Sequence, residues 1–537
     1  MDTATAYDLL LATPAPKFKV DFTAISTLPN EITFSRAGNA MMADATGALT
    51  WAPNNQIINS GDLSNTSFGH AGLVTVTGAY ALAPDGTNSE TLVEFGTPTN
   101  DQLYRDYTTI PGSTVMHSVW LYATGTDIGK KVRLYIRDGT NGTFPFETTV
   151  TLTGTNTRYS VVGTLANNTT TASFRLYGDT ASSFIAWGAQ AELVTYQTTP
   201  GPYVATTSAA YYGPRFDNTL GTANSPLGLL IEEARTNVAL WNRDLTNAAW
   251  TLGATMTRAK NQIGIDGVAN SASSITGGAV SATNTILQAI TLTSSARFQS
   301  AYVKRLVGTG VVNMTLDGGT TWTAITVTSA YTRVTIPTQT LANPSVGFQV
   351  MTSTDSIAVD FVQNENGTFA TSPIFTTTAA VTRAADVGVF AGLALTLLKG
   401  AKVTVVAEVS RLSAVSGSPR IIATAAYAPI YVDTSSRPTT YGLLAGAPNV
   451  LTTAAAVVTT SPFRLGVSWS SSQRSIVGTG TGLNTDAGTS IGTLGTIYLG
   501  SENGSAAANG PIAKLAIYNK RLPDLTLKAK TALGAPL

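Results

Sequence analysis

The sequence predicts an all-β protein made of tandem β-sandwiches. Short runs such as KVRLYIRDG, TRVTIPT and KVTVVAEV alternate apolar and polar residues, as half-buried strands do. The turn pairs DG, NG, GG and PG recur at short intervals between these runs. Runs with a helical period are scarce, and the two short exceptions lie near Leu9 and over 525–533. This pattern is typical of jelly rolls and related sandwiches of short antiparallel strands.

The chain also repeats itself in a consistent order, which predicts two homologous jelly-roll sandwiches. DLSNTSF at 62–68 matches DLTNAAW at 244–250, and HSVWLY at 117–122 matches QSAYVK at 299–304. One match without an internal gap sets four residues against four others: Gln190, Glu192, Tyr196 and Pro200 against Gln363, Glu365, Phe369 and Pro373. The offset between the copies shrinks along the chain, as loop deletions in a second copy would produce.

These matches divide the chain into five segments. The first sandwich is expected over 57–205 and the second over 238–386. An N-terminal segment with a β-hairpin, 1–56, precedes the first sandwich, and a connector, 206–237, precedes the second. The remainder, 387–537, is expected to form a third β unit, which ends in a strand, a Gly/Asn-rich loop, a strand and a closing turn.

The charge and the composition exclude several classes of function. Only 12% of the residues are charged, the net charge is +1, and the chain has no basic or acidic block. Neither nucleic acid nor an anionic membrane is therefore an expected partner, because both bind clustered cations. The chain has no cysteine and only two histidines, which excludes disulfides, thiolate metal sites and zinc sites with three histidines.

The chain is expected to be a soluble protein made in the cytosol. Its best candidate for a membrane span, LALTLLKGAKVTVVAEV, carries Lys399, Lys402 and Glu408 and alternates like a strand. The start of the chain lacks the cationic end and the long apolar stretch of a signal peptide.

The stretch GLLIEEARTN places two acids and an arginine together in a weakly charged chain. On a strand, Glu232 and Glu233 would point to opposite faces, whereas a glycosidase needs two carboxyl groups about 5 to 9.5 Å apart across one bond. Glu233 and Arg235 share a face and can form an ion pair, while Glu232 can bind a backbone amide or Arg215. We therefore predict a structural clasp of Arg215, Glu232, Glu233 and Arg235 that fixes the angle between the two sandwiches, and no catalytic residues.

Three aromatic residues are candidates for carbohydrate binding. On the run SVWLYA, Trp120 and Tyr122 face the same way and could form a platform for a sugar ring. The second copy has Tyr302 and Lys304 at these positions. Trp322, beside a tight turn, is a similar candidate. The alternative is an ordinary second hydrophobic face under a covering loop, since aromatic side chains of a sandwich are mostly part of a core.

Three stretches resemble a family of structural proteins from tailed-phage particles. Residues 34–37, FSRA, match a TFSRA-like stretch, and residues 214–217 match a PRFD element. Residues 228–237 match the third and most specific element, GLLIEEARTN, closely. The first sandwich departs from the pattern, because ALTWAPNNQIINSGDLSN leads into it without an EEARTN element.

The resemblance implies a fold and a function. The two copies look like carbohydrate-binding jelly rolls, and 387–537 looks like a laminin-G or concanavalin-type lectin sandwich. Members of the family occur as tail fibres, head fibres and spikes, which implies a non-enzymatic virion component, assembled in the host cytoplasm, that attaches to host-surface glycans. Residues 1–56 would dock the chain on other virion proteins. Fibre proteins are commonly trimeric, so a homotrimer is expected, although the chain has no heptad run that would enforce one.

No cofactor is expected, and only a structural calcium ion remains open, because jelly rolls of this resemblance often contain one. Its oxygen ligands could come from the Asp-Gly turns at Asp85, Asp138, Asp266 and Asp317. Calcium needs six to eight oxygen ligands, and the sequence has no dense acidic cluster to supply them. Turn chemistry explains each Asp-Gly pair without a metal.

Two other functions remain open beside glycan attachment. The chain could be a capsid or tail decoration protein without a ligand, which the sequence does not separate from a binding protein. It could also be a tailspike that cleaves polysaccharide. Such a spike needs a long parallel β-helix or two converging acids, and the sequence has neither a coil-length repeat nor a matching pair.

Overall fold

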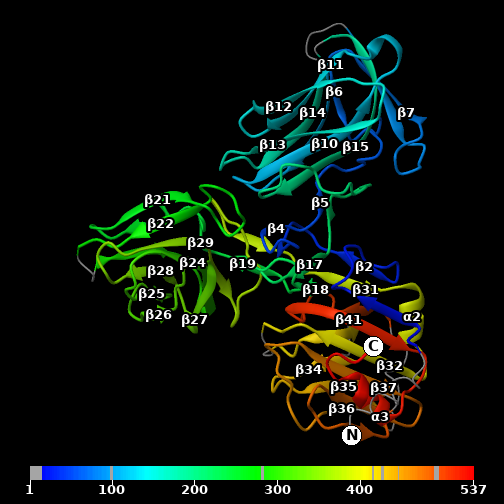
Figure 1. Cartoon of the computed structure of the whole chain (residues 1–537), viewed down its shortest axis with the longest axis vertical. Helices are drawn as coiled ribbons and strands as arrows, with labels where there is room; N and C mark the ends of the chain where they lie inside the picture. Colours follow the sequence, from blue (N-terminus) through cyan, green and yellow to red (C-terminus); the bar gives the residue numbers. More distant parts are fainter. Residues whose placement is uncertain are drawn as a thin grey trace.

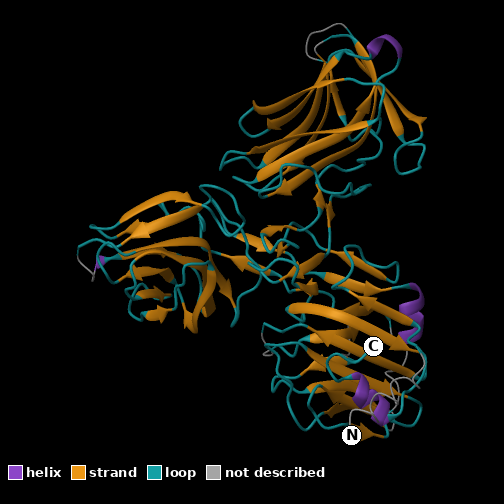
Figure 2. Ribbon diagram, viewed as in Figure 1, coloured by secondary structure: helices purple, strands orange, loops and turns teal. Residues whose placement is uncertain are grey.

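The computed structural model describes residues 15–96, 101–178, 180–279, 283–413, 417–424, 429–444, 447–488 and 495–537. Antiparallel sheets dominate these residues and form three lobes that meet near the centre of the molecule (Figures 1 and 2). The predicted all-β class with tandem sandwiches is therefore confirmed. In the described residues no helix is long and apolar enough to cross a membrane.

The first sandwich pairs two five-stranded sheets. One sheet has the order β13-β10-β15-β8-β7, with the strands Thr157–Thr164, Thr114–Tyr122, Ser182–Val194, Glu90–Phe95 and Val74–Ala81. The other has the order β12-β11-β14-β9-β6, with the strands Thr143–Thr151, Lys131–Asp138, Thr171–Gly178, Gln102–Thr108 and Gly69–Ala71. Val119 and Leu121 of β10 share one buried cluster with Leu134 of β11 and Phe174 of β14. A 3₁₀ turn, η1, spans Gly125–Asp127.

The second sandwich repeats this strand order. Its first sheet is β27-β24-β29-β22-β21, with the strands Thr332–Leu341, Ser295–Val307, Ser356–Asn366, Ala272–Thr276 and Thr257–Gln262. Its second sheet is β26-β25-β28-β23-β20, with the strands Thr323–Ile325, Val312–Thr315, Ser345–Val350, Thr285–Ala289 and Thr251–Leu252. Both predicted copies thus share one topology.

The register of the central strands agrees with the sequence match. Gln190 of β15 lies opposite Ser118 in the first copy, and Gln363 of β29 lies opposite Ser300 in the second. A β-bulge follows Ser118 and Ser300 in both copies. Such a bulge turns the next side chain in a new direction, and this matters below because Trp120 and Tyr302 come directly after it.

The match between Pro200 and Pro373 is wrong by three residues. The Gln190 side chain accepts a hydrogen bond from the Val204 amide, 2.8 Å away, whereas the Gln363 side chain accepts one from Ile374, also at 2.8 Å. Val204 therefore corresponds to Ile374, which places Pro373 against Tyr203. The loop after β15 is three residues longer than its counterpart, and a gap-free comparison of the sequences hides this insertion.

Both sandwiches begin at an equivalent asparagine, although the first lacks EEARTN. The Asn55 side chain accepts a hydrogen bond from the Ala191 amide at 3.2 Å and donates one to the Val204 carbonyl at 2.9 Å. Asn237 makes the same pair of bonds with Asn364, at 3.0 Å, and Ile374, at 3.1 Å. In each copy one asparagine side chain thus hydrogen-bonds the segment that enters the sandwich to the central strand and to the loop that follows this strand.

The C-terminal sandwich contains more of the chain than the expected 387–537. One sheet runs β17-β18-β41-β32-β37-β38-β39, with β1 also paired to β41. Its strands are Arg215–Asn218, Pro226–Ile231, Gly510–Tyr518, Val403–Val409, Phe463–Trp469, Arg474–Gly478, Asn484–Asp486 and, for β1, Phe18–Asp21. The other sheet runs β2-β31-β40-β33-β34-β35-β36, with the strands Ile32–Ser35, Val387–Phe390, Ile497–Leu499, Arg420–Thr424, Ile430–Val432, Pro438–Leu444 and Ala447–Thr452. The expected boundary is corrected accordingly, since β1, β2, β17 and β18 all precede residue 387.

Two short helices and three small strand pairs complete the fold. The helices are α2, Gly392–Leu398, and α3, Asp524–Lys530, the second of which overlaps the expected helical run 525–533. The helical run near Leu9 lies outside the described residues. The small pairs are β3 (Met41–Ala43) with β4 (Leu49–Trp51), β5 (Asn54–Asn55) with β16 (Tyr211–Tyr212), and β19 (Arg235–Asn237) with β30 (Val381–Arg383). Figure 1 shows β4, β5, β17 and β19 near the meeting point of the lobes.

The N-terminal segment should stabilise the C-terminal lobe, because Phe22 is 1% exposed in the same core as Val405 and Leu515. Replacing a buried phenylalanine by alanine costs about 3 to 5 kcal/mol. In Phe22→Ala we expect faster hydrogen exchange in β41 and β32. Phe174→Ala is the matched control, and it should speed exchange in the first sandwich. If exchange in Phe22→Ala rises only within residues 15–35, the segment is not part of that core.

Candidate functional site

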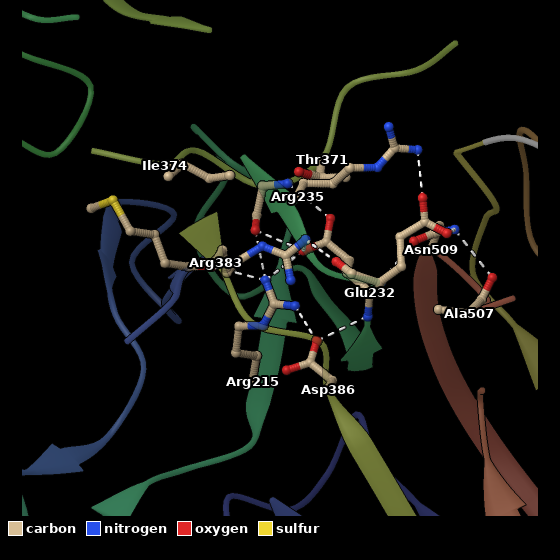
Figure 3. A network of polar contacts seen from close by, with 12 residues as sticks. Arg215, Glu232, Arg235, Thr371, Ile374, Arg383, Asp386, Ala507 and Asn509 are labelled. Carbon is tan, nitrogen blue, oxygen red and sulfur yellow. Dashed lines mark hydrogen bonds and ion pairs between the residues drawn. The ribbon is translucent and has the colours of Figure 1, made fainter. Parts of the chain in front are cut away.

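A buried network of charged side chains lies where the lobes meet. It has five members: Arg36, Arg215, Glu232, Arg383 and Asp386. Arg215 lies on β17 and Arg383 on β30, while Arg36 follows β2, Glu232 follows β18 and Asp386 precedes β31. Arg215 lies at the centre, with Nη1 2.6 Å from Oε2 of Glu232 and Nη2 in contact with Oδ2 of Asp386 (Figure 3). Arg36 Nη1 is 2.9 Å from Oδ1 of Asp386. The side chains of all five residues are at most 4% exposed.

Backbone groups complete the network. The Glu232 amide donates a hydrogen bond to Oδ2 of Asp386 at 2.9 Å, and the Asp386 amide donates one to the Glu232 carbonyl at 2.9 Å. Ser372, in the loop after β29, donates to Glu232 through its amide at 2.8 Å and its hydroxyl at 2.7 Å. The network therefore connects the N-terminal segment, the connector, the second sandwich and the C-terminal sandwich.

The electrostatics keep the network charged. Burial alone would raise the pKa of Glu232, but the neighbouring Arg383 and Arg215 hold it well below its usual range. Arg215 and Arg36 likewise lower the pKa of Asp386 against the effect of burial. Burial lowers the pKa of Arg36 to about 10, which still leaves its guanidinium protonated near neutral pH. Carboxylates held in this way neither give up nor take up protons in the range where a general acid or base works.

The second predicted pair lies beside the network. Arg235 Nη2 is 2.5 Å from Oε1 of Glu233, and the Arg235 guanidinium lies 4.5 Å from the centre of the Phe369 ring. The Glu233 amide donates a hydrogen bond to Asn509 of the C-terminal sandwich at 3.1 Å. The two acids thus contact different arginines, as expected from their alternation. The expected location is corrected, because these contacts join the second sandwich to the C-terminal sandwich and not to the first.

Arg36, Arg383 and Asp386 are the members of the network that sequence reasoning missed. Arg36 stands in the TFSRA-like stretch and could have been included for that reason. Asp386 lies more than 150 residues after Glu232 in a stretch without any motif, and no periodicity connects them. The three stretches that carry the family resemblance each supply one charged residue of the network: Arg36, Arg215 and Glu232.

Trp120 belongs to an aromatic cluster on the outer face of the β13-β10-β15-β8-β7 sheet. Its ring centre lies 5.1 Å from Trp187 and 5.5 Å from Tyr203, and Trp187 and Tyr203 are 4.5 Å apart. The Arg158 guanidinium lies 4.4 Å from the Trp120 ring centre. Trp120, Tyr203 and Arg158 are half-buried, whereas Trp187 is 2% exposed.

A glycine makes room for this cluster. Gly188 has φ of +67°, and a Cβ at this position would lie 2.8 Å from the Trp120 ring. The second copy has Phe361 at the equivalent position, with φ of +44°. There Tyr302 is 6% exposed and shares a buried cluster with Phe361, Met41 and Leu49. The β3–β4 hairpin thus covers the face in the second copy that Trp120 occupies in the first.

Polar groups surround the aromatic cluster. Tyr122, half-buried on the same face, donates a hydrogen bond from its hydroxyl to Oε2 of Glu90 at 2.8 Å. Asn156 donates to the other oxygen of Glu90 at 2.6 Å, and Trp187 donates from Nε1 to Ser89 at 2.9 Å. Trp187 and Tyr203 were missed in the sequence, because they lie 67 and 83 residues beyond Trp120 and only the sheet brings them together.

Trp322 lies in a different lobe from Trp120. It is half-buried in the turn before β26, where a Cβ on Gly319 would lie 2.8 Å from its ring. The structure therefore does not combine Trp322 with Trp120 and Tyr122 in one site.

The acids of the Asp-Gly turns have protein partners. Asp138 accepts hydrogen bonds from Asn141 and Thr169, and Asp317 accepts them from Thr315 and Thr321. Asp85 accepts from Thr87, and Asp266 pairs with Arg243 at 2.6 Å. Among the described residues no group of three or more His, Cys, Asp or Glu side chains could hold a metal ion.

No protein-family model and no curated protein matches the chain. Among solved structures, the enzymatically active domain of a bacteriophage CBA120 tailspike is 15% identical over 26% of this chain and 21% of that chain, with a TM-score of 0.22. The tandem CBM22 domains of Paenibacillus barcinonensis Xyn10C are 12% identical over 59% of this chain and 98% of that one, with a TM-score of 0.24. The Ruminococcus gnavus sialidase CBM40 is 16% identical over 26% and 87%, with a TM-score of 0.23. The chain thus spans about a fifth of the tailspike domain.

Arg215→Ala should be strongly destabilising, because it leaves two buried carboxylates without their shared cation. Removal of one partner of a buried ion pair costs about 3 to 5 kcal/mol. The matched control is Arg235→Ala, where the lost partner, Glu233, is 26% exposed and can bind water. Thermal unfolding followed by circular dichroism should give the larger loss for Arg215→Ala. Equal losses would mean that Arg215 has no special role at the junction.

Asp217 should make the stability depend on pH. It lines a cavity of about 100 Å³ beside Glu232, accepts a hydrogen bond from the Ala43 amide at 2.8 Å, and has its pKa raised by burial to about 6. The folded state therefore keeps a proton that the unfolded chain releases, and stability falls as the pH rises from about 4 to about 6.

Asp217→Asn removes this dependence and keeps the acceptor for Ala43. Its unfolding temperature should match that of the parent protein near pH 4 and exceed it near pH 8, with a gain of up to about 3 kcal/mol. The acidic residues of the network affect both proteins equally at each pH. An equal difference at both pH values would show that Asp217 is ionised normally in the fold.

Proposed function

We propose that the chain is a non-enzymatic structural component of a tailed-phage particle, a fibre or spike, whose first sandwich attaches to host-surface glycans. The observation that carries the proposal is the aromatic cluster of Trp120, Trp187 and Tyr203, with Tyr122 on the same face. Half-buried aromatic rings bordered by fixed hydrogen-bonding groups suit sugars, whose CH groups pack on rings while their hydroxyls need donors and acceptors. Glu90, Asn156 and Arg158 supply those groups beside the rings.

The divergence of the two copies supports a site on the first one. In the second copy the equivalent face is covered by the β3–β4 hairpin and Tyr302 is buried. The first copy leaves Trp120, Tyr122 and Tyr203 half-buried, although burying them completely would be the simpler use of apolar area. A duplicated fold with one packed face and one accessible face is expected when only one copy binds.

The resemblance to phage structural proteins supports the rest of the proposal. Its three motif stretches meet in one buried network and not in an open cleft, which fits a structural role for these stretches. β1 and β2, within residues 18–35, already pair with strands of the C-terminal sandwich, so the segment proposed to dock on other virion proteins is the one before β1. Assembly as a homotrimer would add avidity to weak single sites.

A binding role fits the acids better than hydrolysis does. The neighbouring carboxylates Glu232 and Asp386 share Arg215, and the neighbouring Asp266 and Asp360 share Arg243. The neighbouring arginines lower the pKa of Glu232 and Asp386, so these two carboxyl groups are poor proton donors near neutral pH. The second candidate, a decoration protein without a ligand, is favoured by one observation: Arg158 already covers part of the Trp120 ring.

The test is to incubate the purified chain with host capsule or lipopolysaccharide. We expect the glycan to retain the chain with a dissociation constant of around 1 mM, which corresponds to a binding free energy of about 4 kcal/mol. No new reducing ends should appear. Trp120→Ala should abolish retention, and Tyr122→Phe should weaken it by releasing Glu90. Trp322→Ala is the control in the other lobe and should bind as the parent does.

Each other outcome has a clear meaning. New reducing ends would establish a polysaccharide-cleaving spike. Loss of retention in Trp322→Ala alone would move the site to the second sandwich. No retention and no cleavage would leave the decoration protein.

A further inference from the structure

A second face of the first sandwich carries a group of arginine and aromatic side chains. They lie on the outer face of the β12-β11-β14-β9-β6 sheet, opposite the side that contributes Leu134 and Phe174 to the core. We call this the arginine–aromatic face and define it by six residues: Arg133, Arg137, Arg175, Tyr104, Phe144 and Tyr177. Figure 1 shows β11, β12 and β14 in the upper lobe.

The strand register places these side chains in rows across the sheet. Arg133 lies opposite Tyr177, and Arg175 lies opposite Tyr104. The guanidinium of Arg133 is 4.5 Å from the Tyr177 ring centre, and that of Arg175 is 4.4 Å from the Tyr104 ring centre. Each of these tyrosine rings therefore already has a cation on it.

Arg137 and Arg175 both lie near one exposed ring. Both guanidinium carbons lie 5.7 Å from the centre of the Phe144 ring, and Phe144 is 43% exposed. Arg137 makes no hydrogen bond or ion pair within the part of the chain that the structure describes. Within the described residues, the carboxylate that pairs with Arg175 is that of Asp106, which is 51% exposed and 3.9 Å away. Burial, and then the charge of Arg137, lower the pKa of Arg175, so the two cations repel each other.

The second copy shows that the fold does not need these arginines. The buried pair Ile136 and Phe174 of the first copy corresponds to Met314 and Phe348 of the second. In this register Gln349 stands where Arg175 does, and Thr315 where Arg137 does. Gln349 accepts a hydrogen bond from Asn313 at 2.9 Å, so in the second copy neutral side chains occupy these positions and bond to each other. Two adjacent cations without a full set of anions are a cost to the fold, which a ligand can offset.

We infer that the arginine–aromatic face binds glycans built from carboxylate-bearing sugars, with the carboxylate between Arg137 and Arg175 and the sugar ring against Phe144. Guanidinium groups bind carboxylates through paired N–H donors, and an exposed ring accepts the CH face of a sugar. Single-stranded nucleic acid fits less well, because its bases need free ring faces and the arginines occupy those of Tyr104 and Tyr177. The inference extends the proposed glycan binding to a second face of the same sandwich.

The test measures binding of the full chain to polygalacturonate and to polysialate, with dextran as the neutral polymer, at physiological salt. We expect binding to at least one carboxylated polymer and none to dextran through this face. Arg137→Gln should weaken that binding at least about tenfold, because it removes a charge-assisted contact. It should not lower the unfolding temperature, since Arg137 has no ion pair to lose among the described residues and its charge repels that of Arg175. Phe144→Ala should weaken binding as well.

The controls separate this face from simple charge and from the first site. Arg437→Gln removes a guanidinium from the C-terminal sandwich, where the Arg437 side chain is 42% exposed. This variant should bind as the parent does. Trp120→Ala should still bind the carboxylated polymer. A stronger response to polygalacturonate indicates hexuronic acids, and a stronger response to polysialate indicates nonulosonic acids.

Three results would overturn the inference. One is unchanged polymer binding in Arg137→Gln. Another is equal binding of polyphosphate or of a single-stranded oligonucleotide, with the same loss in Arg137→Gln, which would mean that the face attracts any polyanion. The third is retention on host glycan through Trp120 with no binding to either carboxylated polymer, which rejects this face and keeps the proposed function. A chain that binds no glycan at all would reject both.

Discussion

The contact between Arg215 and its two carboxylates is the constraint on which the arrangement of the lobes depends. Glu232 and Asp386 have lost their water, so each must keep its hydrogen bonds and its cation or pay a large desolvation cost. Those partners come from four separate parts of the chain, and they can meet in only one way (Figure 3). Buried ion pairs add little net stability compared with apolar packing. We infer that the network contributes specificity instead, because another placement of the second sandwich on the C-terminal lobe would leave buried charges unpaired.

This constraint also explains why the equivalent outer faces of the two homologous sandwiches differ in exposure. The β3–β4 hairpin must lie close to the network, because its Met41 carbonyl accepts a hydrogen bond from Arg215. The Ala43 amide of the same hairpin donates a hydrogen bond to Asp217 of the connector. The hairpin therefore occupies the outer face of the second copy, and Tyr302 becomes part of a core. The first copy attaches through β5, β16 and Asn55, which leaves its outer face without such a cover. The same face of the fold is thus covered in the second copy and accessible in the first.

The sequence predicted what is local or repeated. The alternation of Glu232 and Glu233, their separate arginines and the shared register of Gln190 and Gln363 follow from period-two geometry and from the repeat. It could not predict that β1 and β2 join strands almost 500 and 355 residues further on, because pairing partners leave no mark on either segment alone. Asp386 and Tyr203 were missed for the same reason. The Pro200 match failed because a proline is a weak anchor when a three-residue insertion precedes it, whereas the buried glutamines make identical bonds in both copies.

The pairing of β1 with β41 has a consequence for how such a chain would be displayed. The first and last described strands lie in one lobe, so attachment near either of them fixes the C-terminal sandwich. The network then joins the second sandwich to that lobe. The first sandwich stands at the other end of the molecule in Figure 1, and both of its outer faces belong to that distal lobe. If the particle holds the C-terminal lobe, the aromatic cluster around Trp120 and the arginine–aromatic face are the parts presented outward. A ligand would meet the two faces on opposite sides of one sandwich, so a long glycan of mixed composition could contact both without any movement of the lobes.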